Sequence, residues 1–195
     1  MVRVEEADNP FSGVEVGKNP RLTFVDVDSD GDLDAFVGRV GSNNGDIYYF
    51  KNTGNTTNPI FVNQTGTNNP FNDVDVGEHA APTFVDIDND GDMDAFVGNE
   101  DGNILYFKNT GNITNPTFEK QSGTSNPFND VDVGGRAAPT FVDVDNDGDM
   151  DAFVGNEDCN IFSFKNTGST TNPTFEEQSG TSNPFNDVDV GERNA

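Results

Sequence analysis

Short apolar runs separated by turn-forming residues recur along the chain. Between residues 82 and 121 these runs are PTFVDID (82–88), MDAFVGN (93–99), NILYFKN (103–109) and PTFEKQ (116–121). The breaks between them are rich in Gly, Asn, Asp and Pro, the residues that turns require. No ten-residue window has a helical period of apolar positions. The pattern therefore predicts four short β-strands in this segment and no helix.

The same pattern occurs three times. Residues 82–138 and 139–195 are both 57 residues long and differ at nine positions, and residues 22–81 form a related unit of 60 residues. Its three additional residues lie in RVGSNNGD (39–46), where the second unit has NEDGN. The chain also begins with NPFSGVEVGKNP, a diverged form of the NPFNDVDVGE that precedes the second unit. We therefore predict a single repeat domain over residues 1–195, with units at about 22–81, 82–138 and 139–195. Residues 1–21 are then a diverged partial repeat that completes a neighbouring unit or a neighbouring chain.

A four-stranded unit of this length has the size of one β-propeller blade. Its strands carry Phe, Val, Ile and Tyr on both faces, which is expected of sheets that are covered on both sides. A linear β-solenoid is the alternative, but its coils are usually shorter, and the Gly-Gly-x-Gly-x-Asp nonapeptide of one solenoid class is absent here. We predict an all-β fold of three propeller blades, each a four-stranded antiparallel sheet.

The charge balance narrows the possible partners. The chain has 35 acidic and 10 basic residues and a formal charge of −25, which argues against nucleic-acid or anionic-membrane partners. Seventeen Phe nevertheless supply apolar bulk for a core. No apolar run of about 18 residues exists, so we expect no membrane insertion. The start, MVRVEEADNPF, has no apolar segment typical of a secretory signal. The single cysteine, Cys159, rules out an internal disulfide framework.

Much of the acidic charge is concentrated in three nonapeptides. They are DVDSDGDLD from Asp26, DIDNDGDMD from Asp86 and DVDNDGDMD from Asp143. Like charges opposed across a turn repel one another. An acidic turn that only makes the repeat soluble is one explanation. A bound cation is the other, and it is favoured because the ligand positions are kept while position 4 changes from Ser to Asn and position 8 from Leu to Met.

The spacing of these aspartates is that of a calcium loop. Side-chain oxygens fall at positions 1, 3, 5 and 9, Gly at position 6 permits a sharp turn, and the position 7 carbonyl can point inward. Calcium accepts six to eight oxygen ligands in a flexible shell, whereas Mg²⁺ demands stricter octahedral geometry. No His or Cys pair has the spacing of a zinc site. The loop is not an EF-hand, because position 12 is Val37, Val97 or Val154 in place of Glu and no flanking helices are predicted.

The run F-x-x-V-x-V-G followed by P-T-F-V-D-x-D-x-D-G-D-x-D-A-F-V-G resembles the FG-GAP or VCBS repeat, which forms the blades of integrin α-subunit-like propellers. The resemblance covers essentially the whole chain. It implies that the loop joins the first two strands of each blade and binds one Ca²⁺, giving three ions per chain. The implied ligands are Asp26, Asp28, Asp30, Asp32 and Asp34 in the first loop; Asp86, Asp88, Asp90, Asp92 and Asp94 in the second; and Asp143, Asp145, Asp147, Asp149 and Asp151 in the third. The residue at position 7 contributes its carbonyl. The chain departs from the family in having three blades, since closed propellers have about four to eight.

Other candidate features have simpler explanations. The NPF tripeptides recur once per repeat, so we interpret them as a turn followed by a core Phe. The N-x-T sequons at Asn55, Asn63 and Asn112 are explained by the recurring NTGN turns. His79 is the only histidine. Cys159 stands in a turn at the position of Gly102 in the preceding copy, and we expect the cysteine to be exposed. No Ser–His or Cys–His arrangement is available for catalysis, so we expect no enzyme activity.

We expect a calcium-dependent module of the kind found outside the cell or on its surface. It would serve as a structural scaffold or as a recognition surface for a protein or a glycan. A homodimer that completes a six-bladed ring is the expected assembly, because three blades cannot close. The alternative is a fragment, natural or built from duplicated repeats, of a larger propeller lectin, adhesin or enzyme-associated domain.

Overall fold

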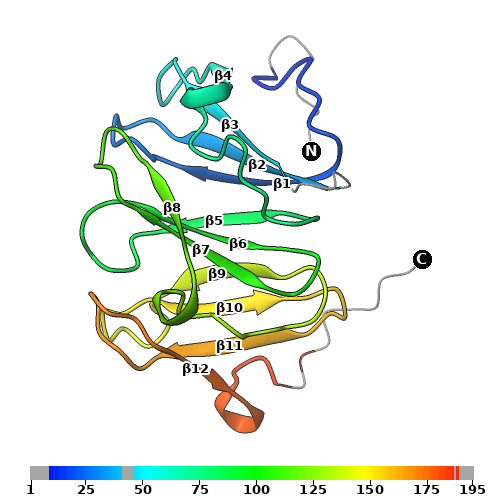
Figure 1. Cartoon of the computed structure of the whole chain (residues 1–195), viewed down its shortest axis with the longest axis vertical. Coiled ribbons are helices and arrows are strands. Elements are labelled where there is room, and N and C mark those ends of the chain that lie inside the picture. The colour runs from blue at the N-terminus through cyan, green and yellow to red at the C-terminus, as the bar shows by residue number, and fades with distance from the viewer. Residues whose placement is uncertain (1–8, 41–45, 187, 189–195) are drawn as a thin grey trace.

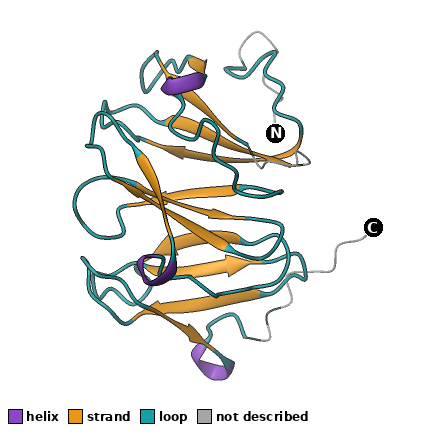
Figure 2. Ribbon diagram, viewed as in Figure 1, coloured by secondary structure: helices purple, strands orange, loops and turns teal. Residues whose placement is uncertain are grey.

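In residues 9–40, 46–186 and 188, which the computed structural model describes, twelve strands form three separate four-stranded antiparallel sheets (Figures 1 and 2). The first sheet contains β1 (Lys18–Val25), β2 (Asp34–Val40), β3 (Ile47–Asn52) and β4 (Phe61–Gln64); the second contains β5 (Ala81–Val85), β6 (Asp94–Gly98), β7 (Ile104–Asn109) and β8 (Phe118–Gln121); the third contains β9 (Ala138–Val142), β10 (Asp151–Gly155), β11 (Ile161–Asn166) and β12 (Phe175–Gln178). In each sheet the strands lie in chain order. The predicted all-β fold with a four-stranded sheet for each repeat is confirmed.

The strand boundaries differ from the sequence-based expectation at the acidic segment. The run 82–88 was expected to be one strand, but β5 ends at Val85 because the chain turns into the aspartate loop at Asp86. Each sheet is also followed by a single turn of 3-10 helix, at Gly66–Asn68, Gly123–Ser125 and Gly180–Ser182. These turns are too short to produce the apolar period by which a helix is predicted. The inserted residues 41–45 of the first repeat lie outside the described residues.

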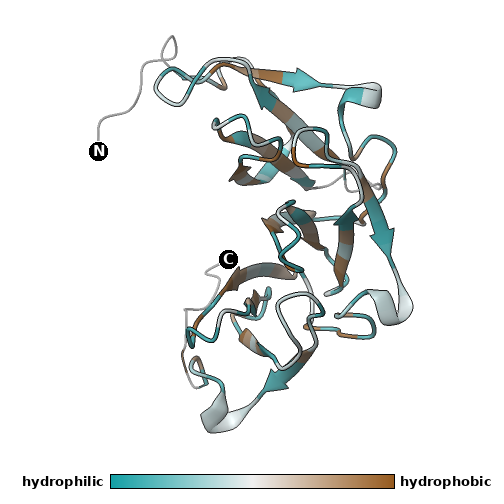
Figure 3. Cartoon of the chain, turned by 90° about the vertical axis from the view of Figure 1, so that its left-hand side faces the viewer, coloured by the Kyte–Doolittle hydropathy of each residue, from teal (hydrophilic) through white to brown (hydrophobic). Residues whose placement is uncertain are grey.

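The three sheets stack side by side, with β5 of the second sheet between β1 and β9 (Figure 1). The fourth strands β4, β8 and β12 lie at the rim, and Figure 3 shows them as the more hydrophilic part of each sheet. This radial order of inner, apolar strands and an outer, polar strand is the arrangement of propeller blades.

The hydrophobic core lies between neighbouring sheets. Phe36 of β2 is fully buried, stacks on Tyr49 at 4.6 Å between ring centroids and contacts Phe84 of the second sheet at 4.4 Å. Ala35, on the opposite face of the same strand, is equally buried. Both faces of the strand are therefore covered, as the lack of strict alternation predicted.

The NPF segments join one blade to the next. Phe71 is buried and stacks on Phe118 at 4.8 Å, and its backbone N–H donates to the side-chain oxygen of Asn69 at 3.0 Å. The predicted turn with a core Phe is confirmed there. Phe11 stacks in the same way on Phe61 of the first sheet, at 4.5 Å. The described part of the leading partial repeat thus packs on the first sheet of its own chain.

Candidate metal centre

The aspartate loops connect the first two strands of every sheet, as the family resemblance implied. They span the interval between Val25 and Asp34 in the first sheet and the matching intervals in the other two. The Gly at position 6 has a φ of +90° to +94° in all three loops. Position 4 is left-handed as well, with a φ of 53° at Ser29, 54° at Asn89 and 61° at Asn146. Asn tolerates this conformation better than most side chains, which gives a reason for the residue choice there.

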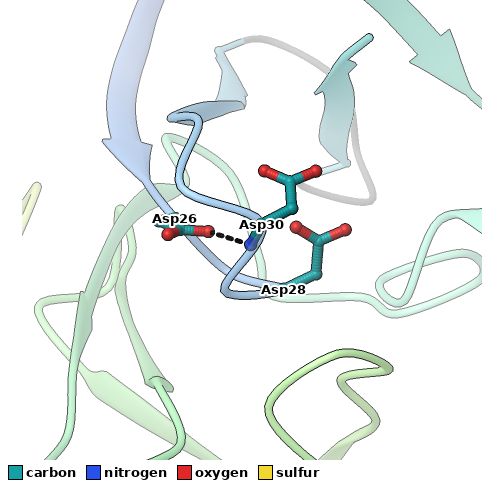
Figure 4. A group of neighbouring side chains, drawn as sticks. All are labelled: Asp26, Asp28 and Asp30. Carbon is teal, nitrogen blue, oxygen red and sulfur yellow. Dashed lines mark hydrogen bonds between the residues drawn. The ribbon is translucent and has the colours of Figure 1, made fainter. Parts of the chain in front are cut away.

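Three carboxylates of each loop converge. One oxygen from each of positions 1, 3 and 5 lies within 4.8 Å of the other two, and the groups are Asp26, Asp28 and Asp30; Asp86, Asp88 and Asp90; and Asp143, Asp145 and Asp147. Figure 4 shows the first group, with its three side chains projecting from one short turn. The turn brings together side chains that the like charges alone would drive apart.

Backbone hydrogen bonds fix the first of these carboxylates. In the first loop one oxygen of Asp26 accepts the N–H of Asp30 at 3.1 Å (Figure 4). Its other oxygen accepts the N–H of Gly31, also at 3.1 Å. Asp30 in turn accepts the N–H of Asp32 at 3.0 Å. The second loop repeats all three bonds. The loop is therefore ordered by its own backbone around the three converging groups.

The ninth position lies apart from the three converging carboxylates, at the first residue of the second strand. Asp34 is fully buried, and its two oxygens accept the Tyr49 hydroxyl at 2.8 Å and the Asn52 N–H at 2.7 Å. Asp94 makes the same two bonds, to Tyr106 at 3.0 Å and to Asn109 at 2.6 Å. Each carboxylate oxygen has a second lone pair. The position 9 aspartate therefore anchors the loop to the third strand, and its role as a metal ligand stays a prediction.

Burial changes the acidity of this ninth position. Desolvation raises the pKa of Asp34 to about 6 and the pKa of Asp94 to about 7. The hydrogen bonds from the backbone and from tyrosine act in the opposite direction but do not outweigh the burial. Burial therefore makes both carboxyls less acidic than an aspartate in water.

The third loop lacks one of these partners. Ser163 occupies the position of Tyr49 and Tyr106, so Asp151 keeps only the hydrogen bond from the Asn166 N–H, at 2.8 Å. Its other oxygen is buried without a hydrogen-bond partner among the described residues.

In each sheet, a lysine of the third strand contacts the aspartate loop of the same repeat. This contact was not predicted from the sequence. The ammonium groups of Lys51, Lys108 and Lys165 pair with the carboxylates at positions 3 and 5, the latter at 3.4 Å in each repeat. The hydrogen bond from Lys165 lowers the pKa of Asp145. The recurring F-K-N at the end of this strand was the available signal, because its Lys recurs once per repeat together with the aspartates.

The donor set fits a hard cation. Within the described residues, buried side-chain oxygens without a hydrogen-bond partner gather in the loops, on Asp28, Asp88, Asp92, Asp143 and Asp151. A buried carboxylate oxygen without a partner is costly, and a cation is the partner that an all-oxygen group accepts. The residues present at positions 1, 3 and 5 could hold calcium in all three repeats.

Residues 26–97 and 86–154 each match the FG-GAP-like repeat, and the two matches together span more than half of the chain. The chain belongs to the FG-GAP-like repeat family. Both matches begin at position 1 of an aspartate loop, and each match includes two of the three loops. A search of curated proteins finds no match to this chain. Within the described residues, no helix has the length and apolar character needed to span a membrane.

The remaining candidate residues are placed as follows. His79 lies beside Glu100, which also accepts a hydrogen bond from Arg136 at 3.1 Å, so these residues link neighbouring repeats. Cys159 is partly buried, whereas the sequence predicts an exposed side chain. Its backbone is left-handed at φ 64°, and so is that of Gly102 in the preceding copy at φ 80°.

Proposed function

We propose that this chain is a calcium-binding propeller module in which one Ca²⁺ per repeat, three in all, holds the first two strands of each blade together. The observation that carries the proposal is the threefold convergence of carboxylates at positions 1, 3 and 5, together with buried loop oxygens that have no other partner. Calcium supplies the positive charge that offsets their repulsion. The remaining ligands of the proposed site are the position 7 carbonyl and the position 9 carboxylate.

The proposed role of the ion is structural. With a dissociation constant of about 10⁻⁴ M, typical of extracellular modules, and about 1 mM calcium, each site stabilises the fold by roughly 1.4 kcal/mol. Three sites are a substantial share of a total stability of about 5–15 kcal/mol. This range of affinity suits an extracellular or cell-surface location. We propose no catalytic role, since ion binding accounts for the converging carboxylates.

Calorimetric titration of metal-free protein tests the proposal. We expect three calcium ions per chain, much weaker binding of Mg²⁺, and a melting temperature that rises with calcium. Asp90→Asn should weaken the second site and leave the other two intact. The matched control is Asp101→Asn, which removes one charge from the turn after β6 without touching a loop carboxylate. Full occupancy with unchanged affinity in Asp90→Asn, or no binding by the native chain, would contradict the proposal.

A second candidate function is recognition of a polar ligand between blades. A groove of about 750 Å³ lies between the first and second sheets and includes Tyr49, Gln64 and Asn72 in its lining. A counterpart of about 730 Å³, which includes Tyr106 and Gln121, lies between the second and third sheets. Recurrence at both junctions favours a repeated binding surface for a glycan or a protein. A glycan array probed in calcium tests whether the chain binds a sugar. Absence of binding to any glycan would exclude that ligand class. If the module binds no ligand at all, its role is that of a spacer.

We further propose that copies of the chain associate through the outer faces of the first and third sheets. A homodimer would then form a six-bladed ring, and the alternative is that further blades of a longer protein cover these faces. The support is the apolar surface that the third sheet exposes at Val142 and Val144.

A further inference from the structure

The lysine at the end of the third strand is placed on the loop by the fold. The N–H of Asn52 donates to the buried carboxylate of Asp34, and this bond fixes the neighbouring Lys51 beside the loop. Its ammonium contacts Asp28 and lies 3.4 Å from Asp30. The same bond and the same pairing recur at Lys108 and Lys165, so the arrangement belongs to the repeat.

The ammonium and a calcium ion would use the same carboxylates. Positions 3 and 5 are two of the three converging groups. The second oxygen of Asp28, a residue that is 9 % exposed, has no hydrogen-bond partner among the residues that the structure describes. One ammonium offsets only part of the charge of three carboxylates. A divalent ion placed among them would be repelled by an ammonium that stayed in contact.

The lysine also has space to move. Its side chain is 34 % exposed in the first and second repeats and lines the inter-blade groove in both. Four rotatable bonds and a strongly hydrated head group suit a side chain that leaves a site without disturbing the backbone.

We propose that Lys51, Lys108 and Lys165 are resident counter-cations of the loops. Each holds the aspartates together in metal-free protein and is displaced by calcium, so that it lowers the calcium affinity of its own repeat and makes the fold less dependent on the ion. The displacement by calcium rests on the proposed function, whereas the pairing of lysine with the aspartates in metal-free protein does not.

The test compares Lys108→Met with the native chain, because methionine keeps much of the apolar stem and removes the charge. Two quantities are measured: calcium affinity by calorimetry, and melting temperature in a chelator. We expect the affinity of one of the three sites to rise about tenfold, an effect of about 1.4 kcal/mol, while the melting temperature in chelator falls. The control is Lys120→Met on the rim strand β8, which makes the same change in net charge away from the loops.

The outcomes separate the two proposals. Calcium binding by the native chain with an unchanged or weakened site in Lys108→Met would overturn the role of the lysine as a competitor. No calcium binding by either protein would overturn the proposed function. If Lys108→Met then also melted in chelator at the same temperature as Lys120→Met, the role of the lysine as a counter-cation would be overturned. Binding by Lys108→Met alone would support the lysine while excluding calcium from the native second loop. Lys108→Arg, which keeps the charge, should preserve the melting temperature in chelator.

Discussion

Asp94 shows how one loop residue ties the aspartate loop to the sheet. Its buried carboxylate accepts hydrogen bonds from the backbone N–H of Asn109 and the hydroxyl of Tyr106, so it joins the second and third strands of the blade. An Asp at this position therefore contributes to folding even in metal-free protein. The third repeat, where Ser163 replaces the tyrosine, offers a natural experiment on the size of that contribution.

Replacing Ser163 by tyrosine should stabilise the chain. Tyr106 stacks on Phe96 at 4.6 Å while donating to Asp94, and the equivalent Phe153 and Asp151 lack such a partner in the described structure. We expect a gain of about 1 kcal/mol in the free energy of unfolding from the restored hydrogen bond, measured by urea denaturation in chelator. Ser163→Phe is the control, since it supplies the ring without the hydroxyl. An equal gain in both variants would show that stacking alone is responsible.

The raised pKa values of Asp34 and Asp94 predict that metal-free protein loses stability as the pH rises, while the stabilisation added by calcium increases. In metal-free protein the folded state keeps these protons up to pH about 6 and about 7, whereas the unfolded chain loses them near pH 4. Their contribution is therefore fully present below pH about 4 and is lost as the pH rises towards 7. Calcium requires the ionised carboxylates, so its stabilising effect should increase over the same interval.

Urea denaturation at about pH 5 and about pH 7.5, each with calcium and with chelator, measures this dependence on either side of the raised pKa values. We expect the difference between calcium and chelator to be larger at the higher pH. Asp94→Asn should reduce the pH dependence in chelator. If calcium raised the free energy of unfolding by the same amount at both pH values, the assignment of these two carboxyls to the site would be contradicted.

At the scale of the elements, two blades approach each other closely at one glycine in the second strand of the first sheet and of the second sheet. A side-chain carbon at Gly98 would lie 2.1 Å from the carbonyl oxygen of Ala137, and one at Gly38 would lie 2.0 Å from that of Ala80. The equivalent Gly155 has nothing within 4 Å, because no further sheet follows it in the described structure. The same residue type therefore meets two different environments in one chain.

Gly98→Ala should destabilise the chain by about 3 kcal/mol, since backbone atoms of two blades must separate to admit the methyl group. Gly155→Ala is the matched control and should change the free energy of unfolding of dilute, monomeric protein by less than about 0.5 kcal/mol. Urea denaturation of both variants measures the difference. Equal destabilisation would mean that the third sheet is covered as the second one is.

At the scale of the whole molecule, the third sheet exposes a face that the other two bury. Val142 is 45 % exposed, whereas Val85 in the second sheet is 8 % exposed, and Val144 is 58 % exposed, whereas Ile87 is 3 % exposed. Phe185, which packs edge-on against Phe153, is also exposed. Neighbouring blades bury the corresponding positions elsewhere in the chain. This exposed apolar face supports the proposed association with another blade of the same kind.

Native mass spectrometry of calcium-loaded protein tests the proposed association. We expect a dimer that carries six calcium ions, and we expect Gly155→Ala and Val144→Ser to shift it towards monomer without lowering the calcium count per chain. A monomer with three ions would indicate that blades outside this sequence cover the face. Any assembly without bound calcium would contradict the central proposal.

The repeat length, the strand number and the position of the metal loop were determined by the sequence, because they depend on local turn residues and on apolar runs that recur at a fixed interval. The grouping of Asp26, Asp28 and Asp30 was predictable for the same reason, since one glycine-containing turn controls all three. The contacts of Asp34 and Lys51 were decided by the tertiary structure. Both depend on the third strand lying beside the loop, although the two segments are well separated in the chain. Strand pairing and burial between blades make the position 9 aspartate an anchor and place the strand lysine beside the aspartate loop. The local sequence carries neither fact.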